Sequence, residues 1–328
     1  MNLTLQALLD EGSRTLFDAG IGEAVLDAKL LLFEAFGTDM THFIMDRNTR
    51  LGDGDSVERA VADYRAMIVR RSKRVPLQQI MGSSEFMGLE FYVNEHVLIP
   101  RQDTETLVEE VLKDFKGQDK KVLDMCAGSG CIGLSLLALG GFKSVTEADI
   151  SLEALKVTKR NAKQVMEAKM NPVKIESQRL AEQPWRMVIE GRLLDSGISV
   201  KPAASVCRVT LVESDLFSSF TGKWQERFDI IVSNPPYIPS AVIEGLEPEV
   251  KDHEPRLALD GSEDGLVFYR RLARECPAYL NPGGAVYLEI GYDQGEAVSG
   301  LLKEAGFEGV CVIKDAPGLD RVVKGIWC

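Results

Sequence analysis

Histidine and grouped cysteines, the side chains that most often hold transition metals, are scarce in this sequence. Its 328 residues include three histidines, which lie far apart: His42, His96 and His253. None of the six cysteines belongs to a C-x-x-C pair, and none has a histidine at the spacing of a zinc site. We therefore expect no metal centre and reduced thiols typical of the cytosol, and we assign the histidines no role.

Long apolar runs and an excess of positive charge are also missing. No run approaches the ~20 residues of a membrane helix. The first residues, MNLTLQALLDEGSRTLF, carry two acidic side chains and no basic segment, so we expect no signal peptide. The net charge of −12 disfavours a protein that grips phosphate backbones, and the basic stretch 65–74 is interpreted as a helix end. A cytoplasmic protein without membrane or direct nucleic-acid binding is expected.

The chain is long enough for a small domain and a larger one, and its pattern changes twice. Residues 1–75 carry apolar positions at helical spacing and predict a small helical domain, with Asp55 or Ser56 capping its last long helix. Residues 76–102 are richer in aromatic and β-branched side chains and predict a β-hairpin linker. Its expected arms are FMGLEFYV and HVLIP, joined by a turn at Asn94-Glu95.

Strands and helices alternate over residues 103–328. Asp103 is the expected N-cap of the first helix, DTETLVEEVLKDF. Strand-like runs follow at 120–126, 144–150, 208–214, 228–234 and 283–290, and the tail reads as two strands joined by a Pro-Gly turn. This pattern predicts an α/β domain built on a doubly wound, mostly parallel sheet.

A glycine-rich turn follows the first of these strands, in VLDMCAGSGCIGLSLL. Gly128 and Gly130 lie where the backbone turns from strand to helix, the place where such sheets bind ligands, and Gly133 completes a G-x-G-x-x-G. The next strand ends near Asp149, whose carboxylate is suited to ribose hydroxyls. The structural alternative for Asp149 is a helix N-cap, a role for which Ser151 is also suited. The glycine loop and Asp149 together indicate an adenosine-containing ligand. They do not distinguish NAD from S-adenosylmethionine.

The motif Asn234-Pro235-Pro236-Tyr237 ends the fourth strand, at the same sheet edge as the glycine loop. The prolines stiffen this corner and remove two backbone donors. The Asn234 side-chain oxygen and the Pro235 carbonyl are placed to accept both hydrogens of a planar amino group, with Tyr237 against its plane. An NAD oxidoreductase has no use for this corner. The corner therefore favours a protein that transfers a group to an amino or amide nitrogen.

These motifs resemble the PrmC/HemK family of protein-glutamine N5-methyltransferases, which use S-adenosylmethionine and modify the GGQ-motif glutamine of class I peptide chain release factors. Further segments resemble the same family: LIPRQDTE, DHEPRLALDGSEDGL, GGAVYLEIGYDQGEAV and IKDAPGLDRVV. The resemblance covers nearly the whole chain and implies a Rossmann-like class I methyltransferase sheet. It also implies a helical N-terminal domain that helps to hold the release factor.

The resemblance assigns roles to particular residues. Cofactor contacts fall on Cys126, Ala127, Gly128, Ser129, Gly130, Asp149, Leu216 and Asn234, with Asp149 at the ribose and Leu216 at the adenine. Substrate contacts fall on Asn234, Pro235, Pro236 and Tyr237, of which Asn234, Pro235 and Tyr237 would be catalytic. Alternatives are a glutamine methyltransferase acting on a ribosomal protein, a DNA adenine-N6 methyltransferase, and a non-catalytic adaptor that binds the cofactor.

One segment departs from the family pattern. The stretch between Asp149 and Asp215 is longer than the family implies, and the extra residues lie near 170–203. Because the motifs on both sides are intact, we predict a surface insertion there whose deletion leaves a folded, cofactor-binding protein.

Overall fold

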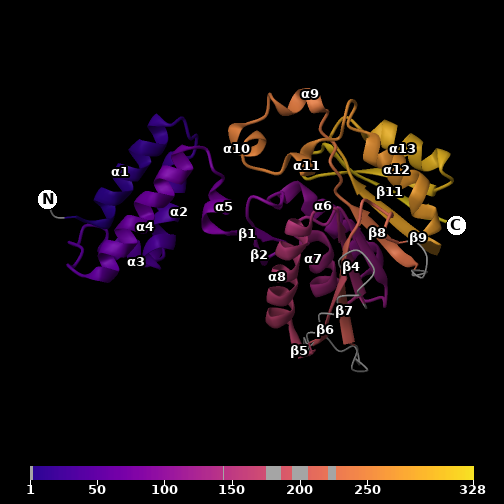
Figure 1. The fold of residues 1–328 in the computed structure, drawn as a ribbon, viewed down its shortest axis with the longest axis horizontal. Coiled ribbons are helices and arrows are strands. Elements are labelled where there is room, and N and C mark those ends of the chain that lie inside the picture. Colours follow the sequence, from indigo (N-terminus) through magenta and orange to yellow (C-terminus); the bar gives the residue numbers. More distant parts are fainter. Residues whose placement is uncertain (1–2, 143, 175–185, 194–205, 221–226) are drawn as a thin grey trace. The chain divides into compact units, whose positions relative to one another are not determined.

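The chain folds into two units, which the computed structural model describes for residues 3–142, 144–174, 186–193, 206–220 and 227–328 (Figure 1). The first unit comprises Met1–Gly82 together with Glu247–His253. The second comprises Ser83–Leu246 and Glu254–Cys328. No helix within the described ranges is both long and apolar enough to span a bilayer.

The first unit is helical, as its sequence predicts. Its elements are α1 (Leu5–Asp18), α2 (Ala24–Phe36), α3 (Met40–Asp46), α4 (Asp55–Ser72), α5 (Leu77–Met81) and α10 (Pro248–Lys251). Apolar stripes on α1, α2 and α4 bury residues such as Leu8, Leu31 and Tyr64 in one core. The N-cap of α4 is Gly54, not Asp55 or Ser56, so that expectation was wrong; Asp55 instead begins the helix, where a carboxylate favours the helix dipole.

Helix α10 groups with the helical unit although the sequence pattern assigned its residues to the 103–328 region. The Arg71 guanidinium on α4 contacts Asp27 at 2.7 Å and Glu249 at 2.9 Å, and all three side chains are largely buried. Because a buried charge without a partner is strongly destabilising, this pairing accounts for the attachment of α10 to α2 and α4. Local periodicity does not reveal such an attachment, because Arg71 and Glu249 are remote in sequence.

The β-hairpin exists, but its predicted register was wrong. Strands β1 (Ser83–Phe86) and β2 (Leu89–Tyr92) pair antiparallel, so both lie within or beside the first expected arm. The turn is Met87-Gly88, where both residues have positive φ, of 53° and 69°. This conformation matches the twist of a two-residue hairpin, which makes Gly88 a better turn residue than Asn94-Glu95. The expected second arm, 96–100, forms no strand.

The second unit is built on a sheet with strand order β10-β11-β9-β8-β3-β4-β7-β6-β5. Its strands are β3 (Lys121–Met125), β4 (Ser144–Asp149), β5 (Met170–Lys174), β6 (Arg186–Leu193), β7 (Val206–Glu213), β8 (Phe228–Ser233), β9 (Leu280–Glu289), β10 (Glu308–Lys314) and β11 (Asp320–Trp327). Strands β3, β4, β7, β8 and β9 run parallel, and the tail pairs antiparallel. The predicted α/β fold is confirmed.

Helices cover both faces of this sheet. They are α6 (Gln102–Phe115), α7 (Cys131–Gly140), α8 (Leu152–Lys169), α12 (Val267–Glu275) and α13 (Gly295–Glu304), with a 3-10 turn at Cys276–Ala278. Two short helices, α9 (Ser240–Ile243) and α11 (Arg256–Leu259), lie in the connection between β8 and α12. One core joins α6, α7 and α8 to residues such as Val122 and Ile230, and the other joins α12 and α13 to Leu123 and Ile231. Successive strand residues therefore enter opposite cores, which explains why these strands are apolar throughout.

The first helix of this unit begins differently from its prediction. Asp103 was expected to be the N-cap of α6, but Arg101 holds that position and Asp103 lies in the first turn of the helix. The Asp103 carboxylate pairs with the Arg321 guanidinium at 3.2 Å instead.

The stretch 170–203 includes structure that the prediction of a surface insertion did not anticipate. Strand β6 pairs antiparallel with β7, and β5 pairs with β6, so the segment extends the edge of the sheet. Met187 and Ile189 on β6 are buried in the core that also holds α8. Deleting 170–203 would remove these two side chains, and we now expect such a deletion to destabilise the domain. Residues 175–185 and 194–203 of this stretch lie outside the described residues.

Two carboxyl groups face each other in the interior of the sheet. Asp124 on β3 and Glu147 on β4 are directly paired in the parallel register, and neither side chain is exposed. Burial raises the pKa of Asp124 to about 7, and burial together with the neighbouring Asp124 raises the pKa of Glu147 well above its usual range. The folded protein therefore binds protons at this pair more tightly than the unfolded chain does.

Stability is expected to fall as pH rises through this pair. In the unfolded chain the two groups titrate near pH ~4, so stability decreases between about pH 4 and the folded-state pKa of Asp124, about 7. Glu147→Gln keeps the shape, removes one charge and offers an amide donor to Asp124. We expect this variant to melt roughly 2–4 °C above the wild type at pH 8, an effect of about 1 kcal/mol, and to lose that advantage at pH 5. Thermal melts of wild type, Glu147→Gln and the exposed control Glu109→Gln test this; equal melting differences at both pH values would contradict it.

Candidate active site

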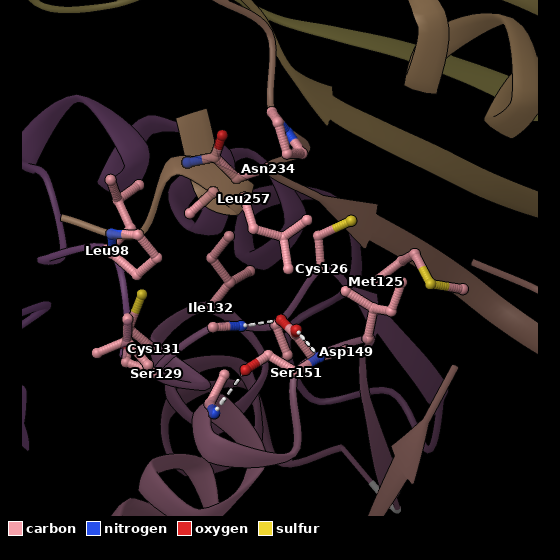
Figure 2. A pocket seen from close by; sticks show the side chains of 18 of the residues that line it. Leu98, Met125, Cys126, Ser129, Cys131, Ile132, Asp149, Ser151, Asn234 and Leu257 are labelled. Carbon is pink, nitrogen blue, oxygen red and sulfur yellow. Dashed lines mark hydrogen bonds between the residues drawn. The ribbon is translucent and has the colours of Figure 1, made fainter. Parts of the chain in front are cut away.

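A cavity of about 350 Å³ opens at the carboxyl ends of the parallel strands. It lies beside β3, where the strand order reverses between β4 and β8, the usual ligand site of a doubly wound sheet. Figure 2 shows Asp149 and Asn234 at opposite ends of the cavity, separated by apolar side chains that include Ile132 and Leu257. The volume falls within the range of small-molecule and cofactor sites.

The glycine loop forms one wall of the cavity. After β3 the backbone takes positive φ at Cys126 (63°), Gly128 (57°) and Gly130 (77°), and α7 begins directly afterwards. The Gly133 backbone N–H donates to Asp124 Oδ2 at 2.8 Å, which ties α7 to the strand. A Cβ at Gly133 would lie 2.3 Å from Glu147 Oε1, so only glycine allows α7 to approach the sheet this closely.

Asp149 ends β4 and holds the loop in place. Its Oδ2 accepts the Gly128 N–H at 2.9 Å and its Oδ1 accepts the Ser151 N–H at 2.8 Å (Figure 2). Burial raises its pKa, while these backbone hydrogen bonds lower it. Ser151 Oγ in turn accepts the Ala154 N–H at 3.2 Å, so Ser151 takes over the capping of α8. Asp149 is thus available as a carboxylate acceptor in the cavity wall.

Leu216 lies in the loop after β7 and also lines the cavity. It is buried and has a φ of 45°, an unusual value for a leucine. The Ser214 hydroxyl donates to the Leu216 carbonyl, which stabilises this conformation. The apolar side chains of Leu216 and Phe268 both line the cavity.

The Asn-Pro-Pro-Tyr corner begins at the end of β8. The buried Ser233 hydroxyl donates to the Met125 carbonyl at 2.6 Å and joins the ends of β8 and β3. The Tyr237 carbonyl accepts from Gln294 Nε2 at 3.1 Å. Gly265, with a φ of +73°, approaches so closely that a Cβ would lie 2.3 Å from the Tyr237 oxygen. The corner is therefore held from several sides.

Most of the sequence-predicted site residues line one cavity. They are Cys126, Ala127, Gly128, Ser129, Asp149, Leu216, Asn234 and Pro236. Gly130, Pro235 and Tyr237 are not among the lining residues. Gly130 caps α7 behind the loop, Pro235 is buried within the corner, and Tyr237 packs against the core of α12 and α13.

Two lining segments were missed as parts of the site. Residues around 96–104 and 255–258 contribute His96, Val97, Leu98, Pro100, Arg101, Thr104, Pro255, Leu257 and Ala258. The buried Glu254 carboxylate links the two segments, because it accepts from Arg101 Nη2 at 2.6 Å and from the Ile99 N–H at 3.3 Å. The family motifs LIPRQDTE and DHEPRLAL were the only sequence signal for these two segments. Neither motif gives a physical reason to expect that the segments lie together. Among the described residues no group of histidine, cysteine and acidic side chains could hold a metal ion.

Comparison with known proteins gives consistent results for both units. The PrmC N-terminal domain family matches residues 7–82, and the methyltransferase small domain family matches residues 102–189. A release factor glutamine methyltransferase of Geobacter sulfurreducens is 36% identical over 98% of this chain and 96% of its own length. Another, of Caulobacter vibrioides, is 38% identical over 99% of this chain and 97% of its own length.

One solved structure of similar description was also found. It is a release factor-specific protein-(glutamine-N5) methyltransferase of Alicyclobacillus acidocaldarius, 28% identical, with a TM-score of 0.36. The match covers 72% of this chain and 99% of that one.

Proposed function

Because the chain belongs to the family of release factor glutamine methyltransferases, we propose that it methylates the side-chain nitrogen of the GGQ-motif glutamine in class I peptide chain release factors. S-adenosylmethionine is the methyl donor. The observation that supports this reaction best is that Asp149 and Asn234 line one cavity, because the reaction needs an acceptor for the ribose and an acceptor for the substrate amide around one cofactor.

The cavity fits this cofactor in three respects. The Asp149 carboxylate suits the ribose hydroxyls, and it is held by two backbone N–H groups. The apolar surface of Leu216 and Phe268 suits an adenine ring. The glycine loop from Cys126 to Gly130 allows the methionine part to approach the backbone closely.

When bound, S-adenosylmethionine supplies an electrophilic methyl group on a sulfonium centre. An amide nitrogen is a weak nucleophile, so its orientation matters greatly. Asn234 Oδ1 and the Pro235 carbonyl accept the two amide hydrogens of the glutamine and turn its nitrogen toward the methyl group. Both acceptors stabilise the positive charge that develops on that nitrogen, while Pro236, which lines the cavity, confines the amide plane. After transfer, the methylated amide nitrogen is positively charged and loses its proton readily, so no strong base is required.

The direct test is a transfer assay with two substrates. The purified protein is incubated with methyl-labelled S-adenosylmethionine and either a class I release factor or the same factor with its GGQ glutamine replaced. We expect label on the first factor alone. Label on both factors would contradict the assignment of the target residue, and label on neither, with cofactor binding confirmed, would overturn the proposed function.

The same assay separates the remaining alternatives. Ribosomal proteins and a DNA duplex are offered in place of the release factor, and we expect no transfer to either. The net charge of −12 supports the absence of direct nucleic-acid binding. A protein of this function works in the cytoplasm, where its substrate acts. Transfer to DNA would favour an adenine-N6 methyltransferase, whose flipped base would occupy the same corner.

A further inference from the structure

A buried glutamine joins three backbone segments behind the Asn-Pro-Pro-Tyr corner. Gln294 lies between β9 and α13 and is 9% exposed. Its Nε2 donates to the Tyr237 carbonyl at 3.1 Å and to the Gly265 carbonyl at 3.3 Å. Its Oε1 accepts the Gly291 N–H at 2.9 Å. One side chain thereby ties the corner to the loop before α12 and to the turn after β9.

These partners leave the Gln294 amide only one orientation. A backbone N–H only donates and a carbonyl only accepts, so Oε1 must face Gly291 and Nε2 must face the two carbonyls. Each of the two Nε2 hydrogens then has an acceptor of its own. A buried amide that is engaged at both ends fixes its partners more narrowly than apolar packing does.

The place of Gln294 in the chain is unusual for this type of residue. It is the N-cap of α13, where serine, threonine, aspartate and asparagine are preferred because their side chains accept from the first turn. The Gln294 side chain makes no such capping bond. Because a shorter residue would cap the helix better, the glutamine is accounted for by the corner that its side chain reaches.

Glycines make room for this arrangement. A Cβ at Gly265 would lie 2.7 Å from Gln294 Nε2, and a Cβ at Gly261 would lie 2.8 Å from the Tyr237 Cα. Real Cβ atoms are not found so close to their neighbours, so the backbone at 261 and 265 can approach the corner only as glycine. The contact between the corner and this loop therefore requires exact backbone positions.

The anchor at Tyr237 and a second anchor at Ser233 enclose the part of the corner that would meet the substrate. The Ser233 hydroxyl donates to the carbonyl at the end of β3 at 2.6 Å and so fixes the chain before Asn234. Between the two anchors, each proline ring fixes its own φ. Few backbone rotations remain free, so Asn234 and the Pro235 carbonyl keep one relative position.

We propose that Gln294 is a positioning residue of the transfer reaction: by fixing the Tyr237 carbonyl, it sets the place of the two acceptors that meet the substrate amide. This inference rests on the proposed function, in which the acceptors are Asn234 Oδ1 and the Pro235 carbonyl. Gln294 is not among the residues that line the cavity, so it acts through the corner. Displacing reacting groups by about 1 Å can lower a rate about 100-fold.

The first test compares the wild type with Gln294→Met and the control Gln164→Met. Methionine has a similar length and removes the hydrogen bonds of the amide. Gln164 on α8 also donates to a backbone carbonyl, that of Glu90 at 3.1 Å, but does not line the cavity. We expect kcat for release-factor methylation to fall roughly 10- to 100-fold in Gln294→Met and to stay at the wild-type value in the control. The KM for S-adenosylmethionine should stay within about twofold in both, because Asp149 lies at the opposite end of the cavity.

A Gln294→Glu variant tests the donated hydrogens directly. Its ionised side chain has the shape of the amide but no hydrogen for the Tyr237 and Gly265 carbonyls, whereas its protonated form has one. Burial and two facing carbonyl oxygens raise the pKa of the introduced carboxyl group. We therefore expect the kcat of this variant, relative to the wild type at the same pH, to be lowest at pH 9 and to rise toward pH 6.

Hydrogen exchange gives a measurement that does not depend on turnover. The Ile238 N–H donates to the Leu259 carbonyl at 3.0 Å, and the Gly261 N–H donates to the Ile238 carbonyl at 2.8 Å. Both amides report on the contact between the corner and the neighbouring loop. We expect their exchange, followed by NMR, to accelerate roughly tenfold in Gln294→Met, while the Ala127 amide of the glycine loop exchanges as in the wild type.

The outcomes separate this inference from the function it rests on. If the wild type labels the release factor and Gln294→Met matches its kcat, the inference is overturned. It is equally overturned if cofactor affinity falls as much as kcat, if exchange at Ile238 and Gly261 is unchanged, or if Gln294→Glu keeps a constant ratio to the wild type between pH 6 and 9. If the wild type labels no release factor, the proposed function fails, and the exchange rates alone then decide whether Gln294 holds the corner.

Discussion

Replacing Asn234 with alanine is expected to lower kcat for release-factor methylation by roughly 100- to 1,000-fold, the usual effect of removing one preorganised group that stabilises transition-state charge. The side chain follows a buried strand, lines the cavity and carries the one side-chain amide of the Asn-Pro-Pro-Tyr corner. Its loss leaves the amide nitrogen of the substrate held by the Pro235 carbonyl alone. The fold should persist, because Ser233, Gln294 and Gly265 hold the corner independently of the Asn234 side chain.

The measurement is single-turnover transfer from labelled S-adenosylmethionine, together with cofactor affinity by calorimetry. Asn281→Ala is the matched control, because it removes the same side chain at the opposite edge of the sheet, where Asn281 donates to Asp229 at 2.9 Å. We expect the control to retain wild-type kcat and Asn234→Ala to retain cofactor binding within a few-fold. Wild-type turnover in Asn234→Ala would disprove the assigned role.

Replacing Asp149 with alanine should weaken S-adenosylmethionine binding by roughly 100-fold or more. Two hydrogen bonds from the ribose to a charged acceptor are lost, and bonds of this kind contribute about 1.5–3 kcal/mol each. The loop is also released, because the Gly128 and Ser151 N–H groups lose their acceptor. The Asp149→Asn variant retains one acceptor oxygen and should lie between alanine and the wild type.

The pH dependence of cofactor affinity gives a second test of Asp149. Binding needs the carboxylate form, and burial raises the pKa of this group. Affinity should therefore fall as pH decreases through that pKa, and Asp149→Asn should lack this decrease. Calorimetric titrations between pH 5 and 8 compare both variants with Asp53→Ala, which changes an exposed aspartate of the helical unit. An unchanged dissociation constant in Asp149→Ala would place the ribose elsewhere.

Several parts of the site could be predicted because their chemistry lies within short stretches of chain. The glycine loop needs a strand, closely spaced glycines and a helix in succession, and all are adjacent in residues 121–140. Asp149 follows from the end of the next strand. The Asn-Pro-Pro-Tyr corner is stiff because of its own two prolines. Since parallel strands bring their carboxyl ends to one edge, the order of elements alone was enough to place these motifs together.

The errors arose where several local solutions were compatible with the same residues. The hairpin turn was expected at Asn94-Glu95, but Met87-Gly88 provides the positive φ values that a two-residue turn requires. The stretch 170–203 was predicted to be a surface insertion. Instead β6 pairs with β7, and Met187 and Ile189 on β6 are buried in the core. In both cases pairing between strands, which is a tertiary property, decided the outcome.

By itself the sequence determined the α/β fold and the meeting of the glycine loop, Asp149 and the Asn-Pro-Pro-Tyr corner at one edge of the sheet, because each depends on neighbouring residues and on the order of elements. Only the tertiary structure decided what supports them. Glu254 approaches Arg101 across a long stretch of chain, and α10 groups with α2 and α4 through Arg71. No local pattern encodes such contacts, because the partners of a buried charge are chosen by the packing of the whole domain.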